Sequence, residues 1–143
     1  CVNAVLAVTV LAAGMSSGVT VALLSPVFAY LFGIAPNLVT VPAIMVGNTV
    51  FVVLLRCVYG NPLWRKLTAW LAAAAAKFAV LYALVVWVIC GVAAEALLAQ
   101  GVLKAPMLTA LPAFFSWPQL VTALIGGAVA IAIVPVIRKA LHK

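Results

Sequence analysis

Long apolar runs separated by short polar or proline-containing segments dominate the chain. A membrane span needs about 20 apolar residues, with a working range of roughly 17–25. By this measure the pattern predicts five spans, at residues 1–14, 18–33, 38–55, 71–94 and 119–137. The first run is short and begins Cys-Val-Asn rather than with Met. We therefore expect that the natural N-terminus is missing from this sequence.

The composition agrees with this pattern. Hydrophobic residues make up 69% of the 143 residues and charged residues only 6%, against roughly 45–50% and 25% in a soluble domain. Such a chain cannot cover itself with polar surface in water. We predict a single integral membrane domain over residues 1–143, with an all-α fold in the form of a polytopic helix bundle.

The basic residues predict an orientation in the membrane. Most of them fall in two segments: Arg56, Arg65, Lys66, Arg138, Lys139 and Lys143. The segments on the opposite side, 34–37 and 99–118, contain only Lys104. By the positive-inside rule, the 56–66 connection and the C-terminus are cytoplasmic and the 99–118 loop is external. Topology thus explains the net charge of +7 without a nucleic-acid partner.

The chain offers little material for catalysis. It has one acidic residue, Glu95, one histidine, His142, and no CxxC spacing among its three cysteines. This excludes a carboxylate pair and a zinc site of the HExxH kind, and it indicates neither a metal nor a cofactor. Nucleotide-binding loops are absent from the sequence, so any ATP would be hydrolysed by another protein. We expect that the chain is not an enzyme.

A few polar residues interrupt the apolar runs. Asn48 lies in VPAIMVGNTVFVVLL, and a buried amide without a partner costs several kcal/mol. Its partner could be another helix, the backbone broken at Pro26 or Pro42, or a bound substrate. Lys77 and Glu95, five helical turns apart, are expected to share a face that points into the bundle or a cavity. That face would also carry Leu81, Leu84, Val88 and Gly91.

Alternatives remain open for both charged residues. Lys77 could extend to the cytoplasmic interface, as long basic side chains do, or contact a partner protein. Glu95 could contact a ligand or be an ordinary interfacial charge. The 99–118 connection holds three prolines, two phenylalanines and a tryptophan. It is expected to lie on the membrane surface or to fold over the bundle as a lid.

Five segments, read in order, resemble the substrate-binding S components of energy-coupling factor (ECF) transporters. They are CVNAVLAVTVLAAG, SSGVTVALLSPVFAYLFGIAPN, VPAIMVGNTVFVVLL, AAAAKFAVLYALVV and SWPQLVTALIGGAVAIAIVP. The resemblance implies six membrane helices, of which five are visible here and the first is missing. It also implies capture of a vitamin or similar nutrient from outside. A membrane partner, the T component, and two ATPases would then drive transport.

Together with this resemblance, the polar and aromatic residues of the external half become candidate substrate contacts. They are Asn3, Asn48, Trp87, Glu95, Trp117 and Gln119. Aromatic faces would cover the ligand and a few polar groups would orient it. Ala72 and Ala76, on a smooth alanine-rich stretch, and Lys77 are candidate contacts to a membrane partner.

Two other functions compete with this one. The chain could be a structural or assembly subunit of a membrane complex with no ligand of its own, using its small-residue faces for contact. It could also be a small secondary carrier or channel. The external aromatic loop favours the binding subunit over the assembly subunit. The single acid and the lack of internal repeats weigh against the carrier.

Overall fold

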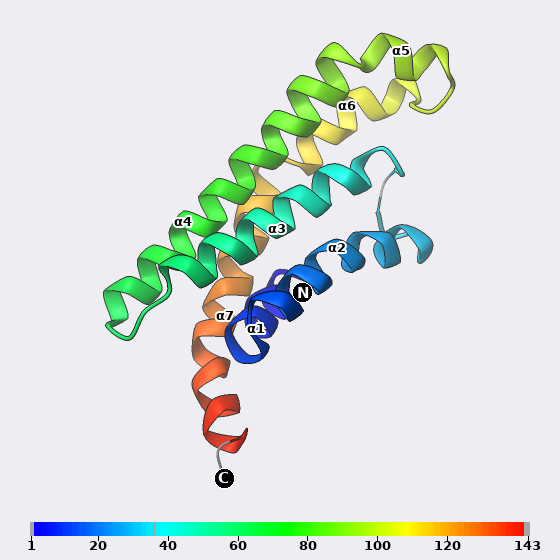
Figure 1. Cartoon of the computed structure of the whole chain (residues 1–143). Helices are drawn as coiled ribbons and strands as arrows, with labels where there is room; N and C mark the ends of the chain where they lie inside the picture. Colours follow the sequence, from blue (N-terminus) through cyan, green and yellow to red (C-terminus); the bar gives the residue numbers. More distant parts are fainter. Residues whose placement is uncertain (1, 36, 142–143) are drawn as a thin grey trace.

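The computed structural model describes residues 2–35 and 37–141, and all regular secondary structure in them is helical (Figure 1). The elements are α1 (Val2–Ala13), α2 (Met15–Leu31), α3 (Thr40–Val58), α4 (Leu63–Tyr82), η1 (Ala83–Val92), α5 (Ala94–Ala99), α6 (Ala105–Phe114) and α7 (Trp117–Leu141). This confirms the all-α prediction. Helices suit such an apolar chain because they satisfy backbone hydrogen bonds within each segment.

Three helical segments are long and apolar enough to cross a membrane. They are Thr40–Val58, the continuous stretch Leu63–Val92 formed by α4 and η1, and Ala105–Ala140, which takes in α6 and α7. These segments indicate a membrane protein. Helices α1 and α2 are apolar but have only 12 and 17 residues, or about 18 and 26 Å of length against a hydrocarbon core of about 30 Å.

Helix α1 lies at the centre of the bundle. It packs against α2, α3 and α7, while α4 packs against α3 and α7. The chain turns from α1 into α2 at Gly14, whose φ of 97° is a conformation that side chains with a Cβ rarely adopt. Helix α6 packs on η1 and on α7. Part of the 99–118 connection therefore folds onto the bundle, with Leu103, Leu111 and Phe115 buried there.

The interior consists of two apolar clusters. The larger one joins α1, α2, α3, α4 and α7 around Leu6, Phe51 and Ala73. The smaller one joins the start of α3, the end of α4, η1 and α6 around Leu81, Val85 and Phe115. The core side chains of both clusters are almost wholly buried.

The buried face of the long α4–η1 helix differs from the predicted one. The structure buries Lys77, Leu81, Val85 and Ile89, four residues apart. From Ala83 the chain forms a π-helix, whose wider turns change which residues share a face. As a result Val88, Gly91 and Glu95 do not share the buried face of Lys77. All three residues are exposed. The prediction of a shared Lys77–Glu95 face was wrong because it assumed α-helical geometry throughout.

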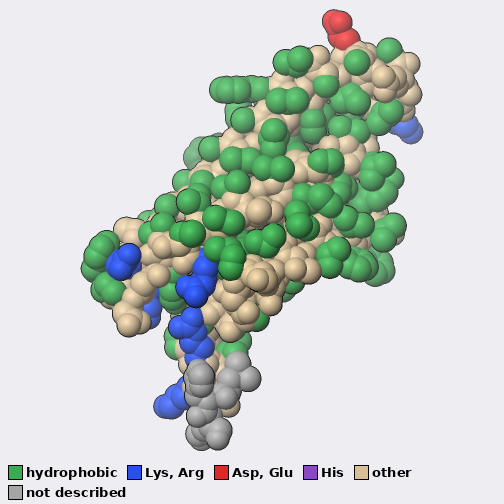
Figure 2. Space-filling view, viewed as in Figure 1, with side chains coloured by type: hydrophobic (Ala, Val, Ile, Leu, Met, Phe, Trp, Pro, Cys, Tyr) green, Lys and Arg blue, Asp and Glu red, His purple; other side chains and the backbone are tan. Residues whose placement is uncertain are grey.

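Most of the basic side chains lie at one end of the molecule. In Figure 2 they gather at the end where α4 begins and α7 finishes, whereas Glu95 projects from the other end, where one basic side chain also lies. Arg138 also has a structural contact at the basic end. Its Nη2 donates a hydrogen bond of 2.6 Å to the carbonyl oxygen of Leu11, in the last turn of α1, where carbonyls lack helical partners.

Glycines in α7 allow two other helices to approach closely. A Cβ added at Gly126 would lie 2.6 Å from the backbone nitrogen of Ala4 in α1, and one added at Gly127 would overlap the Trp70 ring of α4. Small residues serve this purpose at many membrane helix contacts. The contact of α7 with α1 therefore depends on the missing side chain at Gly126.

We expect Gly126→Ala to lower the free energy of unfolding by about 1–3 kcal/mol, because the added methyl group meets the backbone of α1. Gly91→Ala is the matched control, since its Cβ would meet only the Val86 carbonyl oxygen at an ordinary 3.6 Å. Thermal unfolding in mild detergent measures both. Equal unfolding temperatures for the two variants would contradict the close contact between α1 and α7.

Candidate functional site

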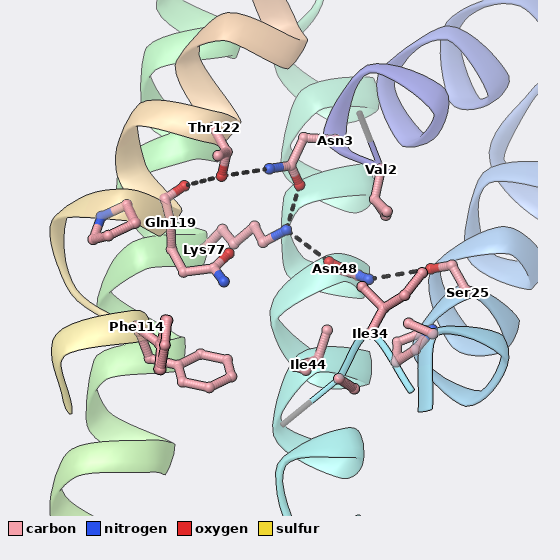
Figure 3. Close-up of a pocket in the computed structure, with 15 residues that line it drawn as sticks. Val2, Asn3, Ser25, Ile34, Ile44, Asn48, Lys77, Phe114, Gln119 and Thr122 are labelled. Carbon is pink, nitrogen blue, oxygen red and sulfur yellow. Dashed lines mark hydrogen bonds between the residues drawn. The ribbon is translucent and has the colours of Figure 1, made fainter. Parts of the chain in front are cut away.

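Lys77 is the most unusual residue of the interior. Its side chain is only 3% exposed, midway along the apolar helical stretch Leu63–Val92. It lies on α4 between the larger apolar cluster, which includes Ala74, and the smaller one, which includes Leu81. The expected extension to the membrane interface is wrong, because the ammonium group points to polar partners inside the bundle (Figure 3).

Two asparagine side chains accept hydrogen bonds from Lys77. Its Nζ donates to Oδ1 of Asn48 at 2.7 Å and, in a short contact, to Oδ1 of Asn3. Since an ammonium group can only donate, both amides must turn their oxygen atoms toward it. Both asparagines are buried, with exposed fractions of 1% for Asn48 and 6% for Asn3. The three residues come from α1, α3 and α4.

The network continues into the remaining two long helices. On one side Nδ2 of Asn3 donates to Oγ1 of Thr122 at 3.2 Å, and Thr122 donates to the Gln119 carbonyl oxygen at 3.1 Å. On the other side Nδ2 of Asn48 lies 3.4 Å from Oγ of Ser25. Side chains of α1, α2, α3, α4 and α7 are thus connected through one lysine.

Asn48 also compensates for a break in α2. Pro26 has no N–H, so the carbonyl oxygen of Ala22, four residues earlier, loses its helical donor. Nδ2 of Asn48 lies 3.5 Å from that oxygen. Among the partners left open for Asn48, the structure thus shows the backbone broken at Pro26.

A cavity of about 430 Å³ lies beside this network, within the range of small-molecule sites. Its polar lining is Asn3, Ser25, Asn48, Lys77, Gln119 and Thr122. Its apolar lining is Val2, Pro26, Ala29, Ile34, Ala35, Ile44, Phe114, Phe115 and Pro118. Figure 3 shows the polar side chains together along one side, with Phe114 and Ile44 on another. The cavity therefore has a hydrogen-bonding wall and an apolar wall.

Three of the six predicted substrate contacts line this cavity, namely Asn3, Asn48 and Gln119. The other three lie outside it. Trp87 is 68% exposed and lies between the buried positions of η1, and Trp117 is 72% exposed at the start of α7. Glu95 is exposed on α5, beyond the end of the π-helix. These three residues do not belong to the site that the structure forms.

The three residues predicted to contact a membrane partner differ in their exposure. Ala72 is exposed and Ala76 is half-buried, so both are accessible on α4. Lys77 is enclosed by the bundle and offers no surface to a partner in this structure. The predicted contact of Lys77 with a partner does not fit this structure, because hydrogen bonds to α1 and α3 hold the side chain inside the bundle.

Sequence reasoning missed several residues of the cavity, among them Ser25, Thr122 and Phe114. Ser25 stands immediately before Pro26, and hydroxyl groups beside a helix break are a usable signal. Thr122 lies one helical turn after Gln119, a spacing that puts both on one face. Phe114 gave no signal beyond its place in an aromatic loop, since its position depends on how α6 folds back.

The site contains a positive charge, that of Lys77, and no negative charge beside it. The sequence contains a single acidic side chain, Glu95, and it lies at the far end of the molecule. Lys77 therefore faces two neutral amides and the ring of Phe51, whose centroid lies 5.7 Å from Nζ. A cation over an aromatic face is stabilised by about 0.5–2 kcal/mol. None of these groups cancels the positive charge.

The side chains around the cavity could contact a small molecule by hydrogen bonds and apolar packing. Within residues 2–35 and 37–141, no group of three or more His, Cys, Asp or Glu side chains could hold a metal ion. The cavity lining presents one cation, hydrogen-bonding groups and an apolar wall. Comparison of the chain with protein-family models, with curated proteins and with solved structures finds no match.

We expect Lys77 and Asn48 to be energetically coupled. Asn48→Leu should lower the free energy of unfolding by about 1–3 kcal/mol, because it deprives the ammonium group of an acceptor. Lys77→Met should also destabilise, since it leaves two buried amides without their donor. The double variant should cost less than the two single costs together, by about 0.5–3 kcal/mol.

Unfolding in detergent, measured for all four proteins of this double-mutant cycle, tests the coupling. Single costs that add up to the double cost within about 0.5 kcal/mol would show that the two side chains do not interact.

Proposed function

We propose that the protein is the membrane-embedded substrate-binding subunit of an ECF-type importer. In this role it captures a vitamin or similar small nutrient from outside the cell. A T component and two ATPases then provide the energy for transport. The observation that carries the proposal is the cavity beside Lys77, which is large enough for a small molecule and lies among apolar helices.

The position of the cavity supports capture from outside. It is lined by Ile34 and Ala35 in the α2–α3 connection and by Phe114 and Phe115 at the end of α6. The basic segments lie at the other end of the molecule (Figure 2). If this basic end is cytoplasmic, as the positive-inside rule proposes, the α2–α3 connection and the end of α6 face outward.

The connections on the cavity side are tied to each other. Nδ2 of Asn37 donates to the carbonyl oxygen of Val102 at 3.1 Å. The α2–α3 connection is thereby linked to the segment between α5 and α6. Closure of the cavity over a captured nutrient would use the α2–α3 connection, whose Ile34 and Ala35 line it.

The proposed partners rest on the resemblance and on accessible surface. Ala72 and Ala76 lie on the accessible side of α4, near the basic end. Alanine side chains allow close helix approach in membranes. We propose this face as the contact with the T component. ATP hydrolysis is assigned to the partner ATPases because the sequence carries no nucleotide-binding loop.

The protein purified in its full length in mild detergent should retain a small molecule in stoichiometric amount. Mass spectrometry of the material released on denaturation identifies it. Phe114→Ala, which removes an aromatic wall of the cavity, should weaken its binding roughly tenfold, or about 1.4 kcal/mol. Trp87→Ala is the matched control, since Trp87 is similarly exposed but lies outside the cavity.

A protein that is empty, and stays empty after exposure to a panel of vitamins and amino acids, would contradict the proposal. The alternative of an assembly subunit without a ligand would then be favoured. Equal loss of affinity in the Phe114 and Trp87 variants would instead show that the solute does not bind in this cavity.

A further inference from the structure

We propose that the captured solute carries a carboxylate or an equivalent singly charged anionic group, and that Lys77 is its counter-charge. This inference rests on the proposed function, because it concerns the solute bound in the same cavity. It adds the chemical class of the solute and the residue that selects it.

The charge balance of the bundle carries the argument. An ionised amine taken out of water is costly unless an opposite charge or several hydrogen bonds compensate it. Lys77 has two amide oxygens and an aromatic ring, but its nearest neighbours include no carboxylate. The only acidic side chain of the sequence, Glu95, is exposed at one end of the molecule. An opposite charge for Lys77 would therefore have to come from outside the chain, and a bound solute can bring it.

The hydrogen-bond geometry leaves room for that charge. The ammonium group has three donors, and the two asparagines occupy two of them. Lys77 also lines the cavity, so its remaining donor can reach a group placed there. Asn3 and Asn48 fix the position of Nζ from α1 and α3. A solute anion would meet a cation that is already oriented, at little cost in side-chain entropy.

The site fits a single negative charge better than a phosphate dianion. Among its lining residues, Lys77 is the one cation, and none is arginine. Arginine is the residue that gives paired, planar contacts to phosphate groups, whereas lysine acts as a point charge. One lysine, with the half-buried amide of Gln119 on the same wall, can neutralise and hold a carboxylate.

The apolar wall indicates the rest of the solute. Phe114 and Ile44 offer an apolar surface on another side of the cavity from the network. A volume of about 430 Å³ equals that of roughly 14 water molecules in the liquid. The site thus suits a small organic acid with an apolar or aromatic body, rather than a whole phospholipid.

Matched acid and amide probes test this inference. Benzoate and hexanoate are titrated against benzamide and hexanamide, with the protein in phosphatidylcholine nanodiscs after its bound solute has been removed. Calorimetry or competition with the recovered solute measures binding. We expect each carboxylate to bind at least tenfold more tightly than its amide. Lys77→Met should abolish that preference, and Trp87→Ala should keep it.

The outcomes separate the two proposals. Binding of amides as tightly as carboxylates, or an unchanged carboxylate preference in a folded Lys77→Met protein, would overturn the inference and leave the binding function standing. Should Lys77→Met fail to fold, the acid–amide comparison in the unmodified protein still decides. The recovered solute decides as well, since a compound without an anionic group overturns the inference.

Failure of the function itself would look different. If neither acids nor amides bind and no solute is recovered, the binding function is overturned together with the inference. A last arm replaces part of the phosphatidylcholine by phosphatidylglycerol. Unchanged benzoate affinity supports a site for a soluble acid, whereas competition by the anionic lipid would show a headgroup site and overturn the inference.

Discussion

The ammonium group of Lys77, held between two asparagine oxygens and two apolar clusters, is the constraint on which the rest of the structure depends. A charge in such surroundings is tolerated only if polar groups are brought to it from neighbouring helices. Asn3 and Asn48 do this directly, and Thr122 and Ser25 extend the connection. Each of the five long helices thereby has one polar side chain whose partner fixes its depth and rotation.

The hydrogen-bond network around Lys77 contributes more to the specific arrangement of the helices than to the stability of the fold. Hydrogen bonds between membrane helices contribute on average about 0.6 kcal/mol each, because polar groups also find partners in the unfolded protein. The close packing around the network contributes in another way, through contacts such as that of Gly126 with Ala4. A buried lysine without a carboxylate is therefore poorly explained by stability alone, which is why we propose a binding role for it.

The sequence predicted the all-helical fold and part of the site. Asn48 was singled out because a polar residue inside an apolar run must have a partner. Pro26 was one of two prolines that indicated where that partner would be, since it frees the carbonyl oxygen of Ala22. Asn3 and Gln119 were chosen together with the resemblance, as polar residues of the external half.

Other features depend on the three-dimensional arrangement. Lys77 was assigned to the interface or to a partner because a single helix gives depth but not neighbours. The π-helix from Ala83 to Val92 changed the buried face, so Trp87 and Glu95 fell outside the cavity. Phe114 joined it only because α6 folds back onto η1 and α7. Such positions depend on packing across the bundle, which the periodicity of hydrophobic residues along the sequence does not predict.

A crystal structure of the full-length protein with its retained solute would test the central claim most directly. The account predicts that Nζ of Lys77 stays within hydrogen-bonding distance of Asn3 and Asn48, with an anionic oxygen of the solute at its third donor. It would be contradicted by a Lys77 side chain that extends to the membrane surface. A solute bound beside Trp87 or Glu95, away from the lysine, would contradict it equally.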